Sequence, residues 1–189
     1  MGNVVVTEFM SLDGVIEDPG GSEGTAAGGW AFHFDRGEEG DRFKQEELMK
    51  ADAQLLGRVT YTGFAQAWPA RNGDEFGRRM NEMPKHVVSG APLDPQWQNA
   101  ERLEGDLAGG VRALKERYEG DILIAGSASL VRSLGDLGLV DEYRLMVYPV
   151  VLGAGRRLFE GASQHALRLT SCQPAGDCLI LTYAPAEVA

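Results

Sequence analysis

The chain alternates short apolar runs rich in β-branched residues with longer runs that are apolar on one side only. The short runs have the length of buried strands, and the longer runs repeat apolar residues at the i, i+3 and i+4 spacing of a helix. The pattern predicts strands at 4–9, 53–57, 85–90, 121–126 and 142–153, and a hairpin within 166–185. It predicts helices at 38–51, 58–67, 71–83, 106–118 and 127–138.

This alternation favours a single α/β domain over residues 1–189, with a mostly parallel sheet covered by helices on both faces. The C-terminal hairpin is expected to add an antiparallel edge. Residues 11–36 are rich in Gly, Asp and Ser and predict an irregular loop, long enough to be either functional or disordered. Pro149 lies inside the strand predicted at 142–153 and places that strand at a sheet edge or a bulge.

The charge and composition of the chain disfavour nucleic-acid binding, membrane association and metal binding. With 18 Lys and Arg against 28 Asp and Glu, the net charge is −10, which disfavours nucleic-acid binding. The sequence has neither a signal-peptide pattern nor an apolar run of the ~20 residues that span a membrane, so we expect a cytoplasmic protein without a membrane partner. Cys172 and Cys178 are expected to be reduced, and the cysteines and histidines show no metal-binding spacing, so no metal is expected.

Two predicted strands end in a glycine that leads directly into a helix. Gly57 is followed by Arg58 and Thr60, and Gly126 is followed by Ser127. Ligands of parallel α/β sheets bind beyond the carboxyl ends of the strands, where helix N-termini attract phosphate and glycine permits close approach. Ordinary helix capping explains either turn equally well when it is taken alone. The pair together indicates a nucleotide site.

Two further turns are less informative. The stretch "VVLGAGRRLF" at 150–159 contains a G-x-G spacing too short for a dinucleotide fingerprint. Asp13 in "SLDG" follows the first strand. Asp-Gly is a common turn pair, so Asp13 is either a turn residue or a functional residue at the end of that strand.

Taken together, these stretches resemble the dihydrofolate reductase superfamily. More narrowly, they are similar to the reductase domain of the bifunctional riboflavin-biosynthesis deaminase-reductase. The matching stretches run along the whole chain and include "SLDGVIE", "LLGRVTY", "GDILIAGSASLVRSL" and "GLVDEYRLMVYPVVLGAGRRLF". The resemblance implies a three-layer sandwich with a mixed, mostly parallel sheet, an antiparallel C-terminal strand and helices on both faces. It also implies a homodimer.

The resemblance further implies that NADPH lies across the carboxyl ends of the central strands. The positions that match the cofactor-binding turns of the family are Gly57, Arg58, Thr60, Gly126, Ser127, Ala128 and Leu130. Ser89 matches a position that faces the adenosine phosphate. The next residue is Gly90, where many relatives carry Arg or Thr, so NADH remains an alternative cofactor.

On the substrate side, the resemblance places Asp13 in the loop over the nicotinamide, as a catalytic residue, and Trp30 against the substrate. The Pro-Trp signature of true dihydrofolate reductases is missing, so Asp35, Glu38 and Glu39 all stay open as the acid. The implied activity is NAD(P)H-dependent hydride transfer to a small heterocyclic or carbonyl substrate, like a pterin or a ribosylaminopyrimidine. Two alternatives are a nucleotide-binding protein without turnover and a folate-specific dihydrofolate reductase.

Overall fold

The computed structural model describes residues 1–187, and its strands form one eight-stranded sheet. The strand order is β4-β3-β2-β5-β1-β6-β8-β7. The strands are β1 Asn3–Ser11, β2 Ala51–Gly57, β3 Lys85–Val88, β4 Ala100–Arg102, β5 Asp121–Ile124, β6 Glu142–Tyr148, β7 Ala166–Ala175 and β8 Cys178–Ala186.

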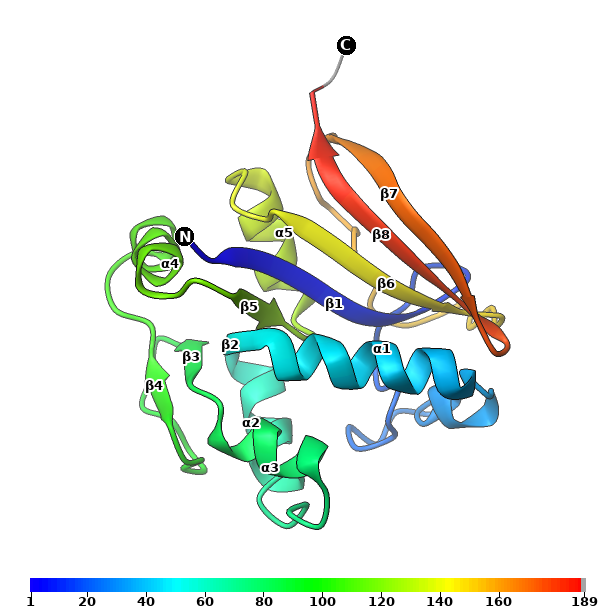
Figure 1. Cartoon of the computed structure of the whole chain (residues 1–189), viewed down its shortest axis with the longest axis horizontal. Helices are drawn as coiled ribbons and strands as arrows, with labels where there is room; N and C mark the ends of the chain where they lie inside the picture. The colour runs from blue at the N-terminus through cyan, green and yellow to red at the C-terminus, as the bar shows by residue number, and fades with distance from the viewer. Residues whose placement is uncertain (188–189) are drawn as a thin grey trace.

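The sheet is parallel from β4 to β6 and antiparallel beyond. Strand β1 lies in the middle and pairs in parallel with β5 on one side and β6 on the other. Strand β8 runs antiparallel to both β6 and β7, so the C-terminal hairpin forms one edge of the sheet (Figure 1). The parallel part therefore brings the carboxyl ends of β1, β2 and β5 to the same rim.

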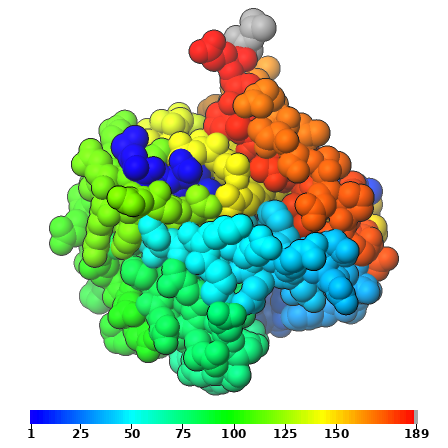
Figure 2. All heavy atoms as spheres, in the orientation of Figure 1, coloured from blue at the N-terminus to red at the C-terminus, as the bar shows by residue number. Residues whose placement is uncertain are grey.

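Helices cover both faces of the sheet, so the predicted three-layer α/β fold is confirmed. The helices are η1 Trp30–His33, α1 Gly37–Lys50, α2 Arg58–Ala67, α3 Glu75–Glu82, α4 Leu107–Arg117 and α5 Ala128–Asp136. Apolar residues of α1, α2 and α3 pack on one face, and those of α4 and α5 on the other. In the space-filling view α1 covers the middle of the face turned to the reader (Figure 2).

Strand β1 shows why its sequence suits the centre of the sheet. Its side chains alternate between the two faces, as the two-residue period of a strand requires. Val4 and Val6 join the core beneath α4 and α5, whereas Val5 joins the core beneath α1, α2 and α3. All three are buried, which is the pattern of a strand covered on both faces.

Two details of the predicted elements are wrong. The short strand β4 was not expected, because its three residues Ala100–Arg102 carry no apolar run. Strand β6 ends at Tyr148, so Pro149 follows the strand instead of interrupting it, and β6 is an interior strand between β1 and β8. Proline lacks the N–H that an interior strand needs, so the ladder stops before it.

The glycine-rich segment after β1 is ordered around one buried aspartate. The Asp18 carboxylate accepts hydrogen bonds from the backbone N–H of Glu23 and Thr25, at 2.9 and 3.0 Å, and from the Thr25 hydroxyl at 3.0 Å. A Cβ atom on Gly28 would overlap this carboxylate, so the loop closes tightly only with glycine there. The contacts to Asp18 therefore hold this loop in a defined conformation.

Two smaller observations complete the fold. Within residues 1–187 no helix is both long and apolar enough to cross a membrane. Cys172 is exposed, Cys178 is buried, and both are free thiols.

Candidate active site

The two glycine turns predicted from the sequence meet at the rim of the sheet, because β2 and β5 are neighbouring strands. A Cβ atom on Gly57 would overlap the Ser127 side chain. A Cβ atom on Gly126 would lie 2.8 Å from Thr60 Oγ1, closer than real Cβ contacts. Each glycine therefore makes room for a side chain of the other turn, and the two helix starts lie side by side.

The helices that begin at these turns are open to a ligand. Neither α2 nor α5 has a side-chain hydrogen bond at its N-cap, whereas Asp74 caps α3 and Asp106 caps α4. Free N–H groups and the positive end of the helix dipole make such termini suited to phosphate. Gly126 and Ser127 both have a positive φ, of 72° and 66°. A non-glycine residue in this conformation is strained, and such strain is concentrated at functional turns.

The other predicted cofactor residues surround this pair of turns. Arg58 is exposed at the first position of α2 and has no ion pair within the described part of the chain. Ser89 directly follows β3, the strand beside β2, and its hydroxyl donates to the Ala91 carbonyl at 2.8 Å. Leu130 is buried in the core beneath α5, so it supports the turn from behind.

A cavity of about 420 Å³ lies next to the turns. Thr60, Gly126, Ser127 and Ala128 contribute to its wall. Much of the remaining wall comes from β1, the 16–23 loop, α1, α2 and α3, and a few residues of η1, β2, β5 and α5 complete it together with Trp68, Arg71, Ala125 and Arg156. Its aromatic residues are Phe9, Phe32, Phe64, Trp68 and Phe76. A cavity of this size with aromatic walls suits a small planar molecule.

A buried carboxyl lies where the cavity meets the second turn. Glu8 belongs to β1, is only 7% exposed, and lines the cavity. Its Oε1 accepts a hydrogen bond of 2.7 Å from the backbone N–H of Gly126. Burial raises the pKa of Glu8 from 4.5 to about 8, and the negative charge of Glu47 adds to the rise. The Gly126 hydrogen bond and the Lys44 charge oppose it.

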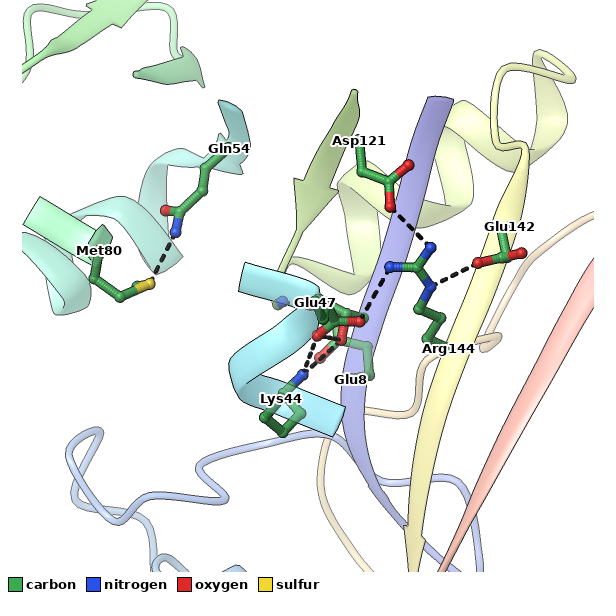
Figure 3. Close-up of polar contacts among 10 residues, drawn as sticks. Glu8, Lys44, Glu47, Gln54, Met80, Asp121, Glu142 and Arg144 are labelled. Carbon is green, nitrogen blue, oxygen red and sulfur yellow. Dashed lines mark hydrogen bonds and ion pairs between the residues drawn. The ribbon is translucent and has the colours of Figure 1, made fainter. Parts of the chain in front are cut away.

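A charged network on α1 lies beside Glu8 (Figure 3). Lys44 Nζ donates to Glu47 Oε1 at 2.6 Å and to the Thr7 hydroxyl at 2.7 Å. The Thr7 hydroxyl in turn donates to Glu47 Oε1 at 2.8 Å. Arg144 of β6 approaches Glu47 Oε2 to 3.6 Å. Two cations thus lie against Glu47, and Glu47 in turn acts electrostatically on Glu8.

Two acceptors in the cavity wall lack a hydrogen-bond donor. Gln54 Nε2 donates to the Met80 sulfur at 3.0 Å, which leaves Gln54 Oε1 without a partner within residues 1–187. Glu47 Oε2 likewise accepts no hydrogen bond in this part of the chain. Buried acceptors without donors are costly, so these two atoms destabilise this part of the wall.

Asp13 does not line the cavity. Its carboxylate accepts hydrogen bonds from the Ser11 hydroxyl at 2.7 Å and from the backbone N–H of Leu152 and Gly153, and Arg157 pairs with it at 3.3 Å. The Ser11 hydroxyl, followed by these N–H groups, holds the pKa of Asp13 well below its usual range. Asp13 therefore stays ionised and ties two loops together. This geometry does not favour the catalytic role predicted for it.

Trp30 also lies away from the cavity wall. Its indole is buried edge-on against Tyr148, with ring centroids 5.3 Å apart, and its Nε1 donates to the Glu17 carbonyl at 2.9 Å. The side chain is part of the core beneath the C-terminal strands. Its neighbours Ala31 and Phe32 line the cavity instead. The prediction of a substrate contact thus fits the segment and not the tryptophan itself.

The acids considered on the first helix do not reach the site either. Asp35 accepts a hydrogen bond from the Gly37 N–H, and Glu38 and Glu39 are exposed at the start of α1. None of the three lines the cavity. Sequence reasoning missed Glu8, although a signal was present. A carboxylate in a mostly apolar central strand is rare without a special reason.

Comparison with known proteins agrees with this architecture. The family model described as the RibD C-terminal domain matches residues 3–181. The chain belongs to the RibD C-terminal domain family. The uncharacterized protein YyaP of Bacillus subtilis (strain 168) is 30% identical over 166 residues, which cover 85% of this chain and 82% of YyaP. The resemblance seen in the sequence is thereby confirmed.

Solved structures share the fold of the RibD C-terminal domain seen here. A putative riboflavin biosynthesis protein from Shewanella sp. PV-4 has a TM-score of 0.75 at 17% identity, covering 98% of this chain and 99% of that one. Riboflavin biosynthesis reductase Rib7 of Saccharomyces cerevisiae has a TM-score of 0.58 at 16% identity, covering 98% and 89%. Dihydrofolate reductase from Enterococcus faecalis, complexed with NADP(H), has a TM-score of 0.57 at 16% identity, covering 98% and 97%.

Proposed function

We propose that this protein is an NADPH-dependent reductase that transfers a hydride to a small planar heterocycle or carbonyl compound held in the cavity. The observation that carries the proposal is the meeting of two uncapped helix N-termini beside an aromatic-walled cavity. The first feature suits a pyrophosphate, and the second suits a flat ring. Membership of a family whose solved relatives include a reductase supports the same activity.

The residues present fit the cofactor. Gly57 and Gly126 let the Ser127 and Thr60 side chains pack close to the backbone, which brings the uncapped starts of α2 and α5 together at one place. The Ser127 hydroxyl and the unpaired guanidinium of Arg58 add a donor and a positive charge. Arg58 is expected to matter strongly, because the protein as a whole is acidic.

When bound, NADPH supplies the hydride, and the protein supplies position and electrostatics. The aromatic wall residues exclude water and hold a planar ring. Gln54 and Glu47 belong to the cavity wall, but Gln54 Oε1 and Glu47 Oε2 themselves are sealed from the cavity.

Titration of the purified protein with NADPH and with NADH by isothermal calorimetry tests the cofactor assignment. Arg58→Ala is expected to weaken NADPH binding about 10- to 100-fold, the cost of a charge-assisted phosphate contact. The matched control is Arg168→Ala, an exposed arginine on β7 at the far edge of the sheet. It is expected to bind NADPH like the wild type.

The outcomes separate the alternatives. Weaker binding confined to the Arg58 variant supports the cofactor site. Similar affinity for NADPH and NADH would show that the protein has no selective site for the 2′-phosphate, as Gly90 suggests. Binding of neither cofactor would refute the proposal. Tight NADPH binding without reduction of any pyrimidine, pterin or quinone would instead indicate a nucleotide-binding protein without turnover.

A further inference from the structure

The cavity wall contains five carboxyl side chains, those of Glu8, Glu17, Asp18, Glu23 and Glu47. Four of them have fixed partners. Arg156 pairs with Glu17 and Glu23, at 3.1 and 3.0 Å. Asp18 accepts the N–H groups of its own loop, and Lys44 pairs with Glu47. Glu8 alone among the five has neither a cation within 4.0 Å nor more than one hydrogen bond in the described part of the chain.

The hydrogen bond that Glu8 does make determines which oxygen is free. The Gly126 N–H donates to Oε1, so Oε1 acts as the acceptor oxygen of the carboxyl group. A proton on Glu8 must therefore reside on Oε2. Oε2 accepts no hydrogen bond in the described part of the chain, yet it is not one of the atoms sealed from solvent. It is therefore exposed to the cavity that Glu8 lines. An O–H at Oε2 therefore has no acceptor within the described part of the chain, on a side chain that lines the cavity.

We propose that Glu8 is the catalytic proton donor of the reduction. The inference rests on the reductase function proposed above. The hydride adds to the carbon of a C=N or C=O bond, and the π electron pair moves to the nitrogen or oxygen. That atom takes the proton from Glu8 Oε2, the O–H bond breaks, and Glu8 remains as a carboxylate. Water returns a proton to Glu8 after the product leaves.

The groups around Glu8 keep it protonated near neutral pH. Burial away from water disfavours its carboxylate form, and the nearby carboxylate of Glu47 does so as well. Lys44 is the cation that faces Glu8 most closely, but its ammonium already binds Glu47 and Thr7. A carboxyl group that titrates near the working pH is matched to general-acid catalysis.

The position of Glu8 also connects the acid to the cofactor turn. The N–H that orients Glu8 belongs to Gly126, which is the residue proposed to meet the pyrophosphate. An acid held by that turn lies at a fixed distance from whatever the turn binds. Asp13, Asp35, Glu38 and Glu39 have no such connection, since none of them lines the cavity.

The first arm of the test needs neither cofactor nor substrate. Protein labelled with ¹³C at the glutamate side-chain carboxyl is titrated by NMR, in the wild type and in Glu8→Gln. Glutamine keeps a carbonyl oxygen for the Gly126 N–H and has no proton to donate. One wild-type carboxyl signal is expected to titrate with a midpoint near pH 8, and this signal should be missing in the variant. A midpoint near the ordinary value for Glu8 would overturn the proposal.

The second arm measures turnover of NADPH with 7,8-dihydropterin and with 5,6-diaminouracil-derived imines as probes. Glu8→Gln is expected to lower kcat about 100-fold or more, within the usual range for a general acid, and to leave the dissociation constant for NADPH unchanged. The wild-type rate should fall above about pH 8 as Glu8 loses its proton. The matched control is Glu38→Gln, on the exposed start of α1.

Each result has a distinct meaning. Retained turnover in Glu8→Gln would overturn the donor role and leave the reductase function standing. Equal loss in Glu8→Gln and Glu38→Gln would also overturn it, because the effect would not be specific to the cavity. No turnover by the wild type with any probe would refute the reductase function, and the donor role with it, whatever the NMR midpoint.

Discussion

Replacing Glu8 by glutamine should change how the stability of the protein depends on pH. The pKa of Glu8 rises from 4.5 in the unfolded chain to about 8 in the folded protein. The folded state therefore binds the proton more tightly than the unfolded state does. The stabilisation is complete below pH 4.5, decreases as the pH rises, and is lost by about pH 8. At about 1.36 kcal/mol for each pH unit, the whole loss is about 5 kcal/mol.

Glutamine does not titrate, so Glu8→Gln lacks this loss. The assay is urea unfolding of the wild type and the variant at a series of pH values, followed by circular dichroism. Between about pH 6 and pH 9, the free energy of unfolding of the variant should rise relative to the wild type by about 3 kcal/mol. Groups remote from Glu8 titrate equally in both proteins and cancel in the difference. A difference that stays constant across this range would refute the reasoning about burial.

Two further variants, with one control, test other parts of the account. Gly126→Ala should abolish NADPH binding and lower the melting temperature, because its Cβ meets Thr60 and its φ is 72°. Gly138→Ala has a similar φ of 65° in open space, so calorimetry should show lost stability of about 1–2 kcal/mol and normal NADPH binding. Asp13→Asn should remove stability at neutral pH. Because the pKa of Asp13 is lowered, thermal melts should show this loss relative to the wild type beginning to shrink below about pH 4 and disappearing only as the pH passes the lowered pKa.

Much of the fold could be predicted because its signals are local. The β-branched run of β1 and the glycines that end β2 and β5 are visible in short stretches of sequence. Parallel strands place their carboxyl ends at one rim, so Gly57 and Gly126 were expected at one site, and the structure packs each glycine against a side chain of the other turn. Strand β4 was missed, because a three-residue edge strand without apolar residues has no pattern.

The polar part of the site could not be predicted, because it depends on tertiary contacts. Glu8 is defined by Gly126 of a distant turn and by Lys44 and Glu47 of α1, none of which is near it in sequence. Trp30 and Asp13 were chosen for their residue type and position in a loop. The packing of Trp30 against Tyr148 shows that Trp30 is a core residue. The hydrogen bond from the Leu152 N–H shows that Asp13 connects two loops. Both observations require the tertiary structure.

The central claim is that a nicotinamide cofactor binds where the α2 and α5 helices begin, with its reactive end in the cavity. The most direct measurement is the amide ¹H–¹⁵N spectrum of the protein during titration with NADPH. The account predicts the largest shifts at residues 57–60 and 126–129, with smaller shifts at Glu8 and Phe9. Shifts that leave these amides unchanged and appear elsewhere, or no shifts at millimolar NADPH, would contradict it.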